Sequence, residues 1–215
     1  MPSLNAIALG CATMTALVTL GARNADVAPF EAQLRPSAAK ELAAGKLLVA
    51  ARGLRDPNFS ETVILLAEHS QESAMGLVLN RRTEVSVARL FPNLQKAQGQ
   101  TAEVYLGGPV TPEGVLALLR STTPSADTRR VMDDVHVVTT RTDLEAQIAA
   151  GADPRRFRIY IGYAGWGPGQ LERETLQGSW HVFTADTAAV FDPEPDSLWQ
   201  RQLRRTEERM VLALP

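Results

Sequence analysis

Short apolar runs, separated by polar or glycine-containing turns, recur along most of the chain. Most of these runs are nearly continuous rather than alternating, which is typical of β-strands covered on both faces. The run at 114–121 (GVLALLRS) also fits a helix, because a short apolar run does not distinguish the two. The predicted strands span 46–51, 61–69, 74–80, 103–108, 114–121, 135–140, 156–164 and 180–185.

One predicted helix connects two of these runs. Thr142 and Glu145 have the spacing of a capping box, in which the Thr hydroxyl and the Glu carboxylate satisfy free amides of the first turn, and Gly151 follows as a stop. The helix joins 135–140 to 156–164. The pattern therefore predicts a βαβ unit with a right-handed crossover between parallel strands.

Further helices are predicted from their capping residues. Pro168 suits the first position of a helix that ends at Gly178, and Asp196 suits the cap of an amphipathic segment at 197–205. Strands interleaved with helices, without an internal repeat, predict a single compact domain of the mixed α/β class. Shorter helices are predicted at 86–91 and 186–191.

The start of the chain differs from the rest. The first 22 residues contain no Asp, Glu, Lys or Arg, so all 46 charged residues lie in the remaining 193. The apolar stretch at 6–21 resembles the hydrophobic region of a signal peptide and is too short for a membrane span. It favours export to the periplasm or envelope, although no clean cleavage pattern follows, so a cytoplasmic chain stays open. We therefore divide the chain into a signal-like leader with linker at 1–37 and a domain at 38–215, with no integral membrane domain.

The charge balance argues against a nucleic-acid partner. The formal net charge is -2 and the sequence pI is about 6.0, whereas nonspecific nucleic-acid binding needs an excess of Lys and Arg to displace counterions. Arginines occur in scattered pairs, such as Arg81-Arg82 and Arg204-Arg205. Such pairs are typical of solvated surfaces or of an anion site assembled by the fold. The predicted partner is a small anionic ligand or a protein.

The residue inventory offers little for catalysis or metal binding. Cys11 is the only cysteine and lies in the leader, so the body has no Cys nucleophile, disulfide framework or cysteine zinc site. No G-x-S-x-G, H-E-x-x-H or calcium-loop pattern occurs. His69 lies at a predicted strand end, where Glu68 and Ser70 are candidates to orient it as a base. We predict no cofactor and no metal, and we assign no catalytic residue.

Two glycine-rich segments follow predicted strands. Gly107 and Gly108 require a sharp turn or a close approach of another backbone. The segment at 162–172 (GYAGWGPGQLE) places glycines between a strand and a helix start, an arrangement that can bind an anion through free amides. It lacks the Lys-Ser/Thr of a P-loop and the dinucleotide-binding register, so a tight turn explains it as well. Glu172 and Glu174 are two residues apart and do not share a helix face.

Five strings, in chain order, resemble the YqgE/AlgH family, also named DUF179 or UPF0301: GLRDPNFSETVILLAEH, AMGLVLN, VYLGGPV, GYAGWGPGQLERE and WHVF. The resemblance covers residues 40 to 205. It implies a compact domain with a strongly bent mixed sheet that forms a pseudo-barrel, flanked by a few helices. The family carries the label of a transcriptional regulator, with no agreed enzyme activity, cofactor or catalytic residue. The chain departs from the family pattern at Arg82, where Pro is common, and at Ala51-Arg52, where Met-Pro is usual.

The resemblance and the glycine segments together select the candidate ligand-binding residues. They are Asn80, Gly107, Gly108, Gly165, Trp166, Gly167, Gly169, Gln170 and Glu172. Our favoured hypothesis is a noncatalytic ligand-binding, protein-binding or regulatory domain. The alternative is a nucleotide- or phosphometabolite-binding enzyme that uses the loop from Gly162 to Glu172. A transcriptional regulator is a weaker alternative, because the sequence shows no helix-turn-helix pair.

Overall fold

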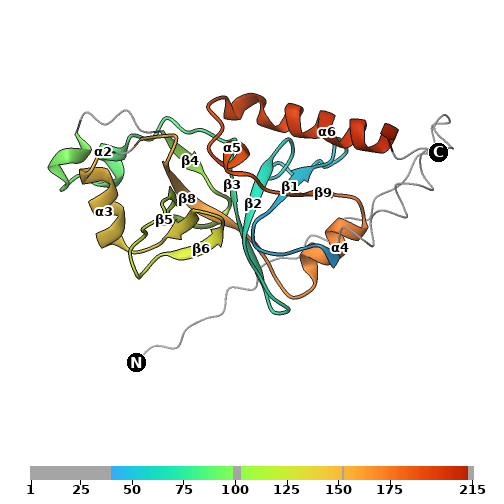
Figure 1. The fold of residues 1–215 in the computed structure, drawn as a ribbon, viewed down its shortest axis with the longest axis horizontal. Coiled ribbons are helices and arrows are strands. Elements are labelled where there is room, and N and C mark those ends of the chain that lie inside the picture. The colour runs from blue at the N-terminus through green and yellow to red at the C-terminus, as the bar shows by residue number, and fades with distance from the viewer. Residues whose placement is uncertain (1–39, 99–102, 152, 213–215) are drawn as a thin grey trace.

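The computed structural model describes residues 40–98, 103–151 and 153–212, and the predicted leader at 1–37 lies outside them. Nine strands form a sheet in the order β6-β7-β5-β8-β3-β2-β1-β9, with β4 beside β8 (Figure 1). The β4–β8 pair is parallel and the other named pairs are antiparallel. The strands are β1 (Lys46–Ala50), β2 (Val63–His69), β3 (Ala74–Val78), β4 (Val104–Leu106), β5 (Val110–Arg120), β6 (Arg129–Met132), β7 (Val135–Val138), β8 (Phe157–Trp166) and β9 (Trp180–Thr184).

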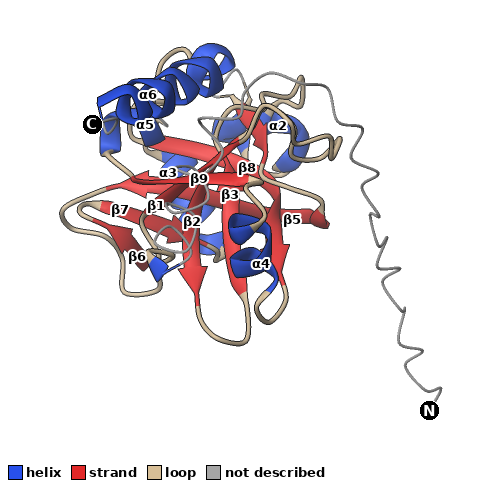
Figure 2. Ribbon diagram, turned by 90° about the vertical axis from the view of Figure 1, so that its right-hand side faces the viewer, coloured by secondary structure: helices blue, strands red, loops and turns tan. Residues whose placement is uncertain are grey.

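All eight predicted apolar runs overlap a strand, and the run at 114–121 belongs to strand β5 rather than to a helix. Strand β6 was not predicted. Helices flank the sheet in both views (Figures 1 and 2). They are α2 (Val87–Leu90), α3 (Arg141–Ala149), α4 (Gln170–Leu176), α5 (Thr187–Val190) and α6 (Leu198–Leu212), with 3-10 turns η1 (Gln95–Ala97) and η2 (Pro195–Ser197). Within the described residues, none of these helices is long and apolar enough to cross a membrane.

The sheet bends sharply within β8. Residues 157–161 and Tyr163 of β8 pair with β5, and residues 159–161 also pair with β4 on the opposite side. Residues 164–166 pair instead with β3. The change of partner follows Gly162, whose φ of 65° breaks the extended conformation at the irregularity in the β5–β8 pairing. The resulting curled sheet forms a half-barrel, which confirms the strongly bent mixed sheet expected from the resemblance, with β8 shared by its two parts.

Both faces of the central strands are covered. Residues 47–50 of β1 are all fully buried, and because neighbouring strand residues point to opposite faces, neither face meets solvent. Helix α6 contributes Leu198, Trp199 and Leu203 to the larger core, whereas α3 packs Leu144 and Ile148 into a second cluster. Burial on both faces explains why these strands read as continuous apolar runs.

The predicted βαβ unit has an additional strand inside it. Strands β7 and β8 both run antiparallel to β5 and lie on opposite sides of it. They are therefore parallel to each other, as predicted, but they are not neighbours. The sequence interval between β7 and β8 contains only α3, so the intervening β5 could not be inferred from it.

Three helix starts differ from the predicted ones. Thr140, not Thr142, caps α3, because its hydroxyl accepts from the Asp143 amide (3.2 Å) and donates to the Asp143 carboxylate (2.7 Å). Gly169, with φ 64°, caps α4, so Pro168 lies before the helix. Asp196 lies within η2 and does not cap α6. The predicted short helices are confirmed, with side-chain caps at Ser86 and Asp186.

Candidate functional site

The loop at residues 56–61 connects the two groups of candidate residues. Phe59 from this loop packs against two tryptophans that also contact each other, with ring centroids 6.1 Å from Trp166 and 5.9 Å from Trp180. Both indole nitrogens donate to the same oxygen of Glu174, Trp166 at 3.0 Å and Trp180 at 2.9 Å. One carboxylate on α4 therefore fixes the aromatic pair that holds one side of the 56–61 loop.

Polar contacts hold the other side of the loop. Arg81 donates to the carbonyl oxygens of Pro57 (3.1 Å) and Ser60 (3.2 Å). Partial burial lowers the pKa of Arg81, while the nearby Asp56 carboxylate acts in the opposite direction. Asp56 also accepts from the amide of Asn58 (2.7 Å), which closes the turn at the tip of the loop.

Asn80 fastens the end of the same loop. Its Oδ1 accepts from the Val63 amide at 2.9 Å, and its Nδ2 donates to the Glu61 carbonyl at 2.9 Å. Glu61 has a positive φ of 56°, a strained conformation for a residue with a side chain. Such strain persists only where surrounding contacts over-determine the backbone, and it is concentrated at functional sites. Asn80 thus has a clear structural role in shaping the loop.

A small hollow lies beside this loop. Its volume is about 30 Å³, close to that of one water molecule. Leu106 is 38% exposed at this hollow, although it is a large apolar side chain. Polar Asn58 and Arg81 lie next to apolar Leu106, so the surface offers both hydrogen-bonding and apolar contacts. The lining residues are Asn58, Val78, Arg81, Leu106, Gly108 and Pro109.

Gly107 and Gly108 allow β4 and its following turn to approach β8. A Cβ on Gly107 would lie 2.3 Å from the Gly162 carbonyl oxygen, and one on Gly108 would lie 2.2 Å from the Tyr163 carbonyl carbon. Both distances are far below van der Waals contact, so only glycine fits at either position. These two candidates therefore fix the backbone that borders the hollow.

The candidates at the start of α4 contact one another rather than an open space. Gln170 accepts from the Gly167 amide through Oε1 (3.1 Å) and donates to Glu174 through Nε2 (2.9 Å). A Cβ on Gly165 would lie 3.2 Å from a methyl of Val110. The amide of Gly167, which an anion would use, is thus occupied by the chain's own glutamine, and a carboxylate lies beside it.

Glu172 faces away from this group and pairs with a histidine. Its Oε1 lies 2.7 Å from Nε2 of His69, which links the end of β2 to α4. Glu68 forms an ion pair with Arg129 instead of orienting His69, so the neighbours in sequence were the wrong candidates. As the spacing predicted, Glu172 and Glu174 act on different sides of the helix.

Metal binding finds no support in the described part of the chain. No group of three or more His, Cys, Asp or Glu side chains there is placed to hold an ion. His136 contacts the carbonyl oxygen of Asp134 at 3.2 Å and is buried, in keeping with a structural histidine.

Several residues of this site were missed as binding candidates. Phe59 and Asn58 belong to a string that carried the family resemblance, and that string was the available signal. Arg81 was noted only as one of a scattered arginine pair, Glu174 only for its spacing from Glu172, and Leu106 only within a family string, because their contacts here join segments far apart in sequence.

Tyr105, next to Leu106, makes the stability of the folded protein depend on pH in the alkaline range. Burial raises its pKa from 10.0 to about 12, and its hydrogen bond to Glu103 (2.7 Å) adds to this effect. The folded state therefore holds the phenolic proton more tightly than the unfolded state. The associated stability is fully present below pH 10 and is lost as the pH rises towards about 12.

We expect the free energy of unfolding to fall more steeply over this pH interval in the native protein than in Tyr105→Phe. Urea unfolding at a series of pH values measures this difference, with phenolate absorbance as the direct titration. Parallel stability curves for the two proteins would show that Tyr105 titrates normally.

Comparison with known proteins gives concordant results. A model of the family described as AlgH-like, DUF179, matches residues 47–211. A UPF0301 protein of Streptomyces avermitilis is 37% identical over 178 residues, which cover 78% of this chain and 89% of the relative. A UPF0301 protein of Caulobacter vibrioides is 38% identical over 170 residues, or 77% of this chain and 87% of that protein.

Two solved structures are similar in fold. The solution structure of the AlgH protein from Pseudomonas aeruginosa has a TM-score of 0.64 and 31% identity, covering 80% of this chain and 94% of that one. The crystal structure of a Corynebacterium diphtheriae protein has a TM-score of 0.65 and 28% identity, covering 77% and 87% respectively. The bent mixed sheet is therefore a fold that this chain shares with both proteins.

Proposed function

The chain belongs to the AlgH-like family DUF179, and we propose that it is a noncatalytic binding domain that recognises a protein partner. The observation that carries this proposal is the 56–61 loop, which is held rigidly while it presents its tip to solvent. Packing of Phe59 on two tryptophans, two hydrogen bonds from Arg81 and one from Asn80 to the Glu61 carbonyl all act on this short segment. A loop ordered before binding loses less conformational entropy when a partner docks.

The surface beside the loop supports a protein partner rather than a small molecule. The hollow of about 30 Å³ is far below the several hundred Å³ that small-molecule sites occupy. Exposed Leu106, with Asn58 and Arg81 at its side, instead provides an apolar anchor point with polar neighbours. This combination is typical of a protein interface, where apolar contacts are surrounded by hydrogen-bonding groups.

Catalysis by the residues near this surface is not favoured. In the described residues, neither His69 nor Glu172 is hydrogen-bonded to a Ser, Thr or Cys side chain, which a base and its nucleophile require. The nucleotide-binding alternative loses its best donor, because Gln170 occupies the Gly167 amide. DNA recognition by a helix-turn-helix also lacks support, since α2 and α5 have four residues each and are separated by strands.

The two exposed leucines of the described chain allow a matched test. Leu106 is 38% exposed at the proposed interface, and Leu176 is 46% exposed on α4. We expect a photoreactive amino acid at position 106 to form a discrete protein adduct in cells that produce this chain natively. The same group at position 176 should form none, because exposure alone does not create an interface. The readout is the adduct mass and its identity by mass spectrometry.

Binding to the purified adduct partner then tests the polar contacts. Arg81→Ala should raise the dissociation constant about tenfold or more, since it removes a charged group and loosens the 56–61 loop. Circular dichroism must show that the variant is folded. Equal adducts at positions 106 and 176, or unchanged affinity in folded Arg81→Ala, would refute this interface.

A further inference from the structure

Three strands border the sheet. It ends at β6 on one side and at β9 on the other, and β4 pairs with β8 on one side only. An open edge presents unpaired N–H and C=O groups to other chains, so proteins shield such edges with charged residues, bulges, very short strands or a covering segment. The three edges of this sheet differ in these devices.

The edges of β6 and β4 are both shielded. Strand β6 exposes Arg129 and Arg130, and its pairing with β7 shifts register between Arg130 and Met132. Strand β4 has only three residues, and residues 81–83 run along its free side, joined to it by backbone hydrogen bonds of 2.8 Å. Another strand would therefore meet charge at β6 and an occupied backbone at β4.

Strand β9 has none of these devices. Its five residues, WHVFT, include no Pro, Lys, Arg, Asp or Glu. Its register with β1 is unbroken from Trp180 to Thr184, so no bulge twists the edge away. Within the described residues, β9 pairs with β1 alone. By the features that shield the other two edges, this edge is open to a further strand.

The pairing with β1 determines which backbone groups of β9 point outward. Residues 179 and 185, at the two ends of the strand, form backbone hydrogen bonds with residues 51 and 45 (2.9 and 3.0 Å). Bonding alternates along an antiparallel strand, so the backbone groups of Trp180, Val182 and Thr184 point away from β1. No backbone hydrogen bond to these outward groups occurs in the described part of the chain.

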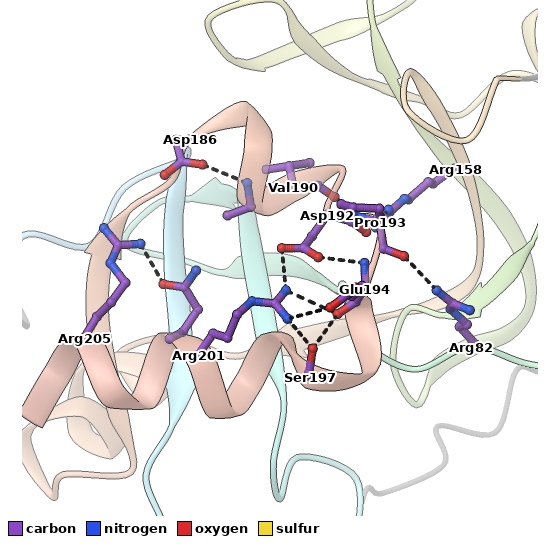
Figure 3. Close-up of polar contacts among 12 residues, drawn as sticks. Arg82, Arg158, Asp186, Val190, Asp192, Pro193, Glu194, Ser197, Arg201 and Arg205 are labelled. Atoms are coloured by element: carbon purple, nitrogen blue, oxygen red, sulfur yellow. Dashed lines mark hydrogen bonds and ion pairs between the residues drawn. The ribbon is translucent and has the colours of Figure 1, made fainter.

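Helices cover both faces of β9 and hold the strand extended. On one face the Trp180 indole donates to Glu174 of α4 at 2.9 Å. On the other face Arg205 of α6 lies 5.6 Å from the centre of the Phe183 ring. Helix α6 is itself anchored through Arg201, whose contacts Figure 3 shows. A strand that is already ordered loses little conformational entropy when its edge is paired.

We propose that β9 pairs antiparallel with β9 of a second copy of this chain, so that the two sheets join across a two-fold axis at Val182. This arrangement places Trp180 of each copy opposite Thr184 of the other, and Val182 opposite itself. Every outward amide of β9 then meets an outward carbonyl, whereas a shifted register would leave some of them unpaired. The contact is isologous and closes after two copies.

Charge at the two ends of β9 supports a second copy as the occupant. Lys46 of β1 donates to the Thr184 hydroxyl at 3.2 Å and has no ion pair within the described residues. Glu174 lies at the other end of the same face, bound to Trp180. Side chains directly opposite in antiparallel strands share a face, so the pairing brings Lys46 of each copy towards Glu174 of the other. This surface differs from the proposed interface at Leu106, and neither proposal depends on the other.

Sedimentation equilibrium of the full chain tests this pairing. We expect a monomer–dimer equilibrium, and Val182→Pro should raise its dissociation constant about tenfold or more, because the outward amide is lost in both copies. Proline is tolerated on an edge strand where the lost N–H faced outward, so the bonds to β1 should remain. Val182→Thr keeps the amide, and this matched control should dimerise like the native protein. Circular dichroism compares the fold of the three proteins.

Hydrogen exchange locates the contact without any substitution. The Val182 and Thr184 amides should exchange more slowly as the protein concentration rises, whereas the Phe183 amide, which faces β1, should be protected at every concentration. A native protein that stays monomeric at its highest soluble concentration would overturn the proposal. A dimer unaffected by Val182→Pro would also overturn it. Outward amides that are protected in the monomer would show that another segment or partner occupies the edge, with the same consequence.

Discussion

Gly108→Ala is expected to prevent the chain from reaching its native fold. The new Cβ would lie 2.2 Å from the carbonyl carbon of Tyr163 and 2.3 Å from the amide nitrogen of Ala164. Both atoms belong to the backbone of β8, which pairs with β3, β4 and β5 and so cannot move aside. The φ of 153° at Gly108 adds a conformation that L-residues rarely adopt. We expect a loss of more than about 4 kcal/mol, within the range of the most damaging single substitutions.

Gly53→Ala is the matched control for this substitution. A Cβ at Gly53 would have no atom within 4 Å, so the variant should fold like the native protein. Soluble yield, circular dichroism and urea unfolding compare the two variants. A folded Gly108→Ala protein with native-like stability would mean that the turn after β4 does not approach β8 this closely. The Gly-Gly-Pro string would then have no structural explanation.

The strands could be predicted because their signal is local. Because β1 and β2 are buried on both faces, nearly all their residues must be apolar, and such a continuous apolar run is visible in the sequence. Strand β6 has no such signal, since only Val131 among its four residues is buried. Its position depends on pairing with β7. The bend in β8 likewise depends on partners that lie far away in the chain.

The candidate site was predicted only in part, because most of its contacts join residues that lie far apart in the sequence. Gly107 and Gly108 were selected because glycine pairs indicate a close backbone approach, and the structure shows the backbone they approach. An anion site at 162–172 was a hypothesis based on local geometry alone. In the structure the Gln170 side chain accepts from the Gly167 amide and donates to Glu174, so the chain itself uses the group that an anion would bind. No rule of residue spacing could reveal this.

Glu174→Ala is expected to lower the free energy of unfolding by about 3 kcal/mol, because each buried donor left without a partner costs about 1 to 3 kcal/mol. The two donors are the indole N–H groups of Trp166 and Trp180, which are 4% and 3% exposed and share one carboxylate oxygen of Glu174. Urea unfolding followed by tryptophan fluorescence measures the loss. Phe59 packs on both rings, so the 56–61 loop should also become less ordered. Faster hydrogen exchange at the Ser60 amide, which donates to Asp56 at 2.7 Å, would report this local effect.

Glu172→Ala separates this effect from the general loss of a carboxylate on α4. Glu172 pairs with His69 at 2.7 Å, but both side chains are partly exposed, so its removal should cost less than about 1 kcal/mol. It should leave exchange at Ser60 unchanged, because His69 makes no contact with the 56–61 loop among the hydrogen bonds of the described residues. Equal destabilisation by the two substitutions would show that Glu174 acts through helix charge alone. The rigid loop would then lose its main support, and the protein-binding proposal would lose the observation on which it rests.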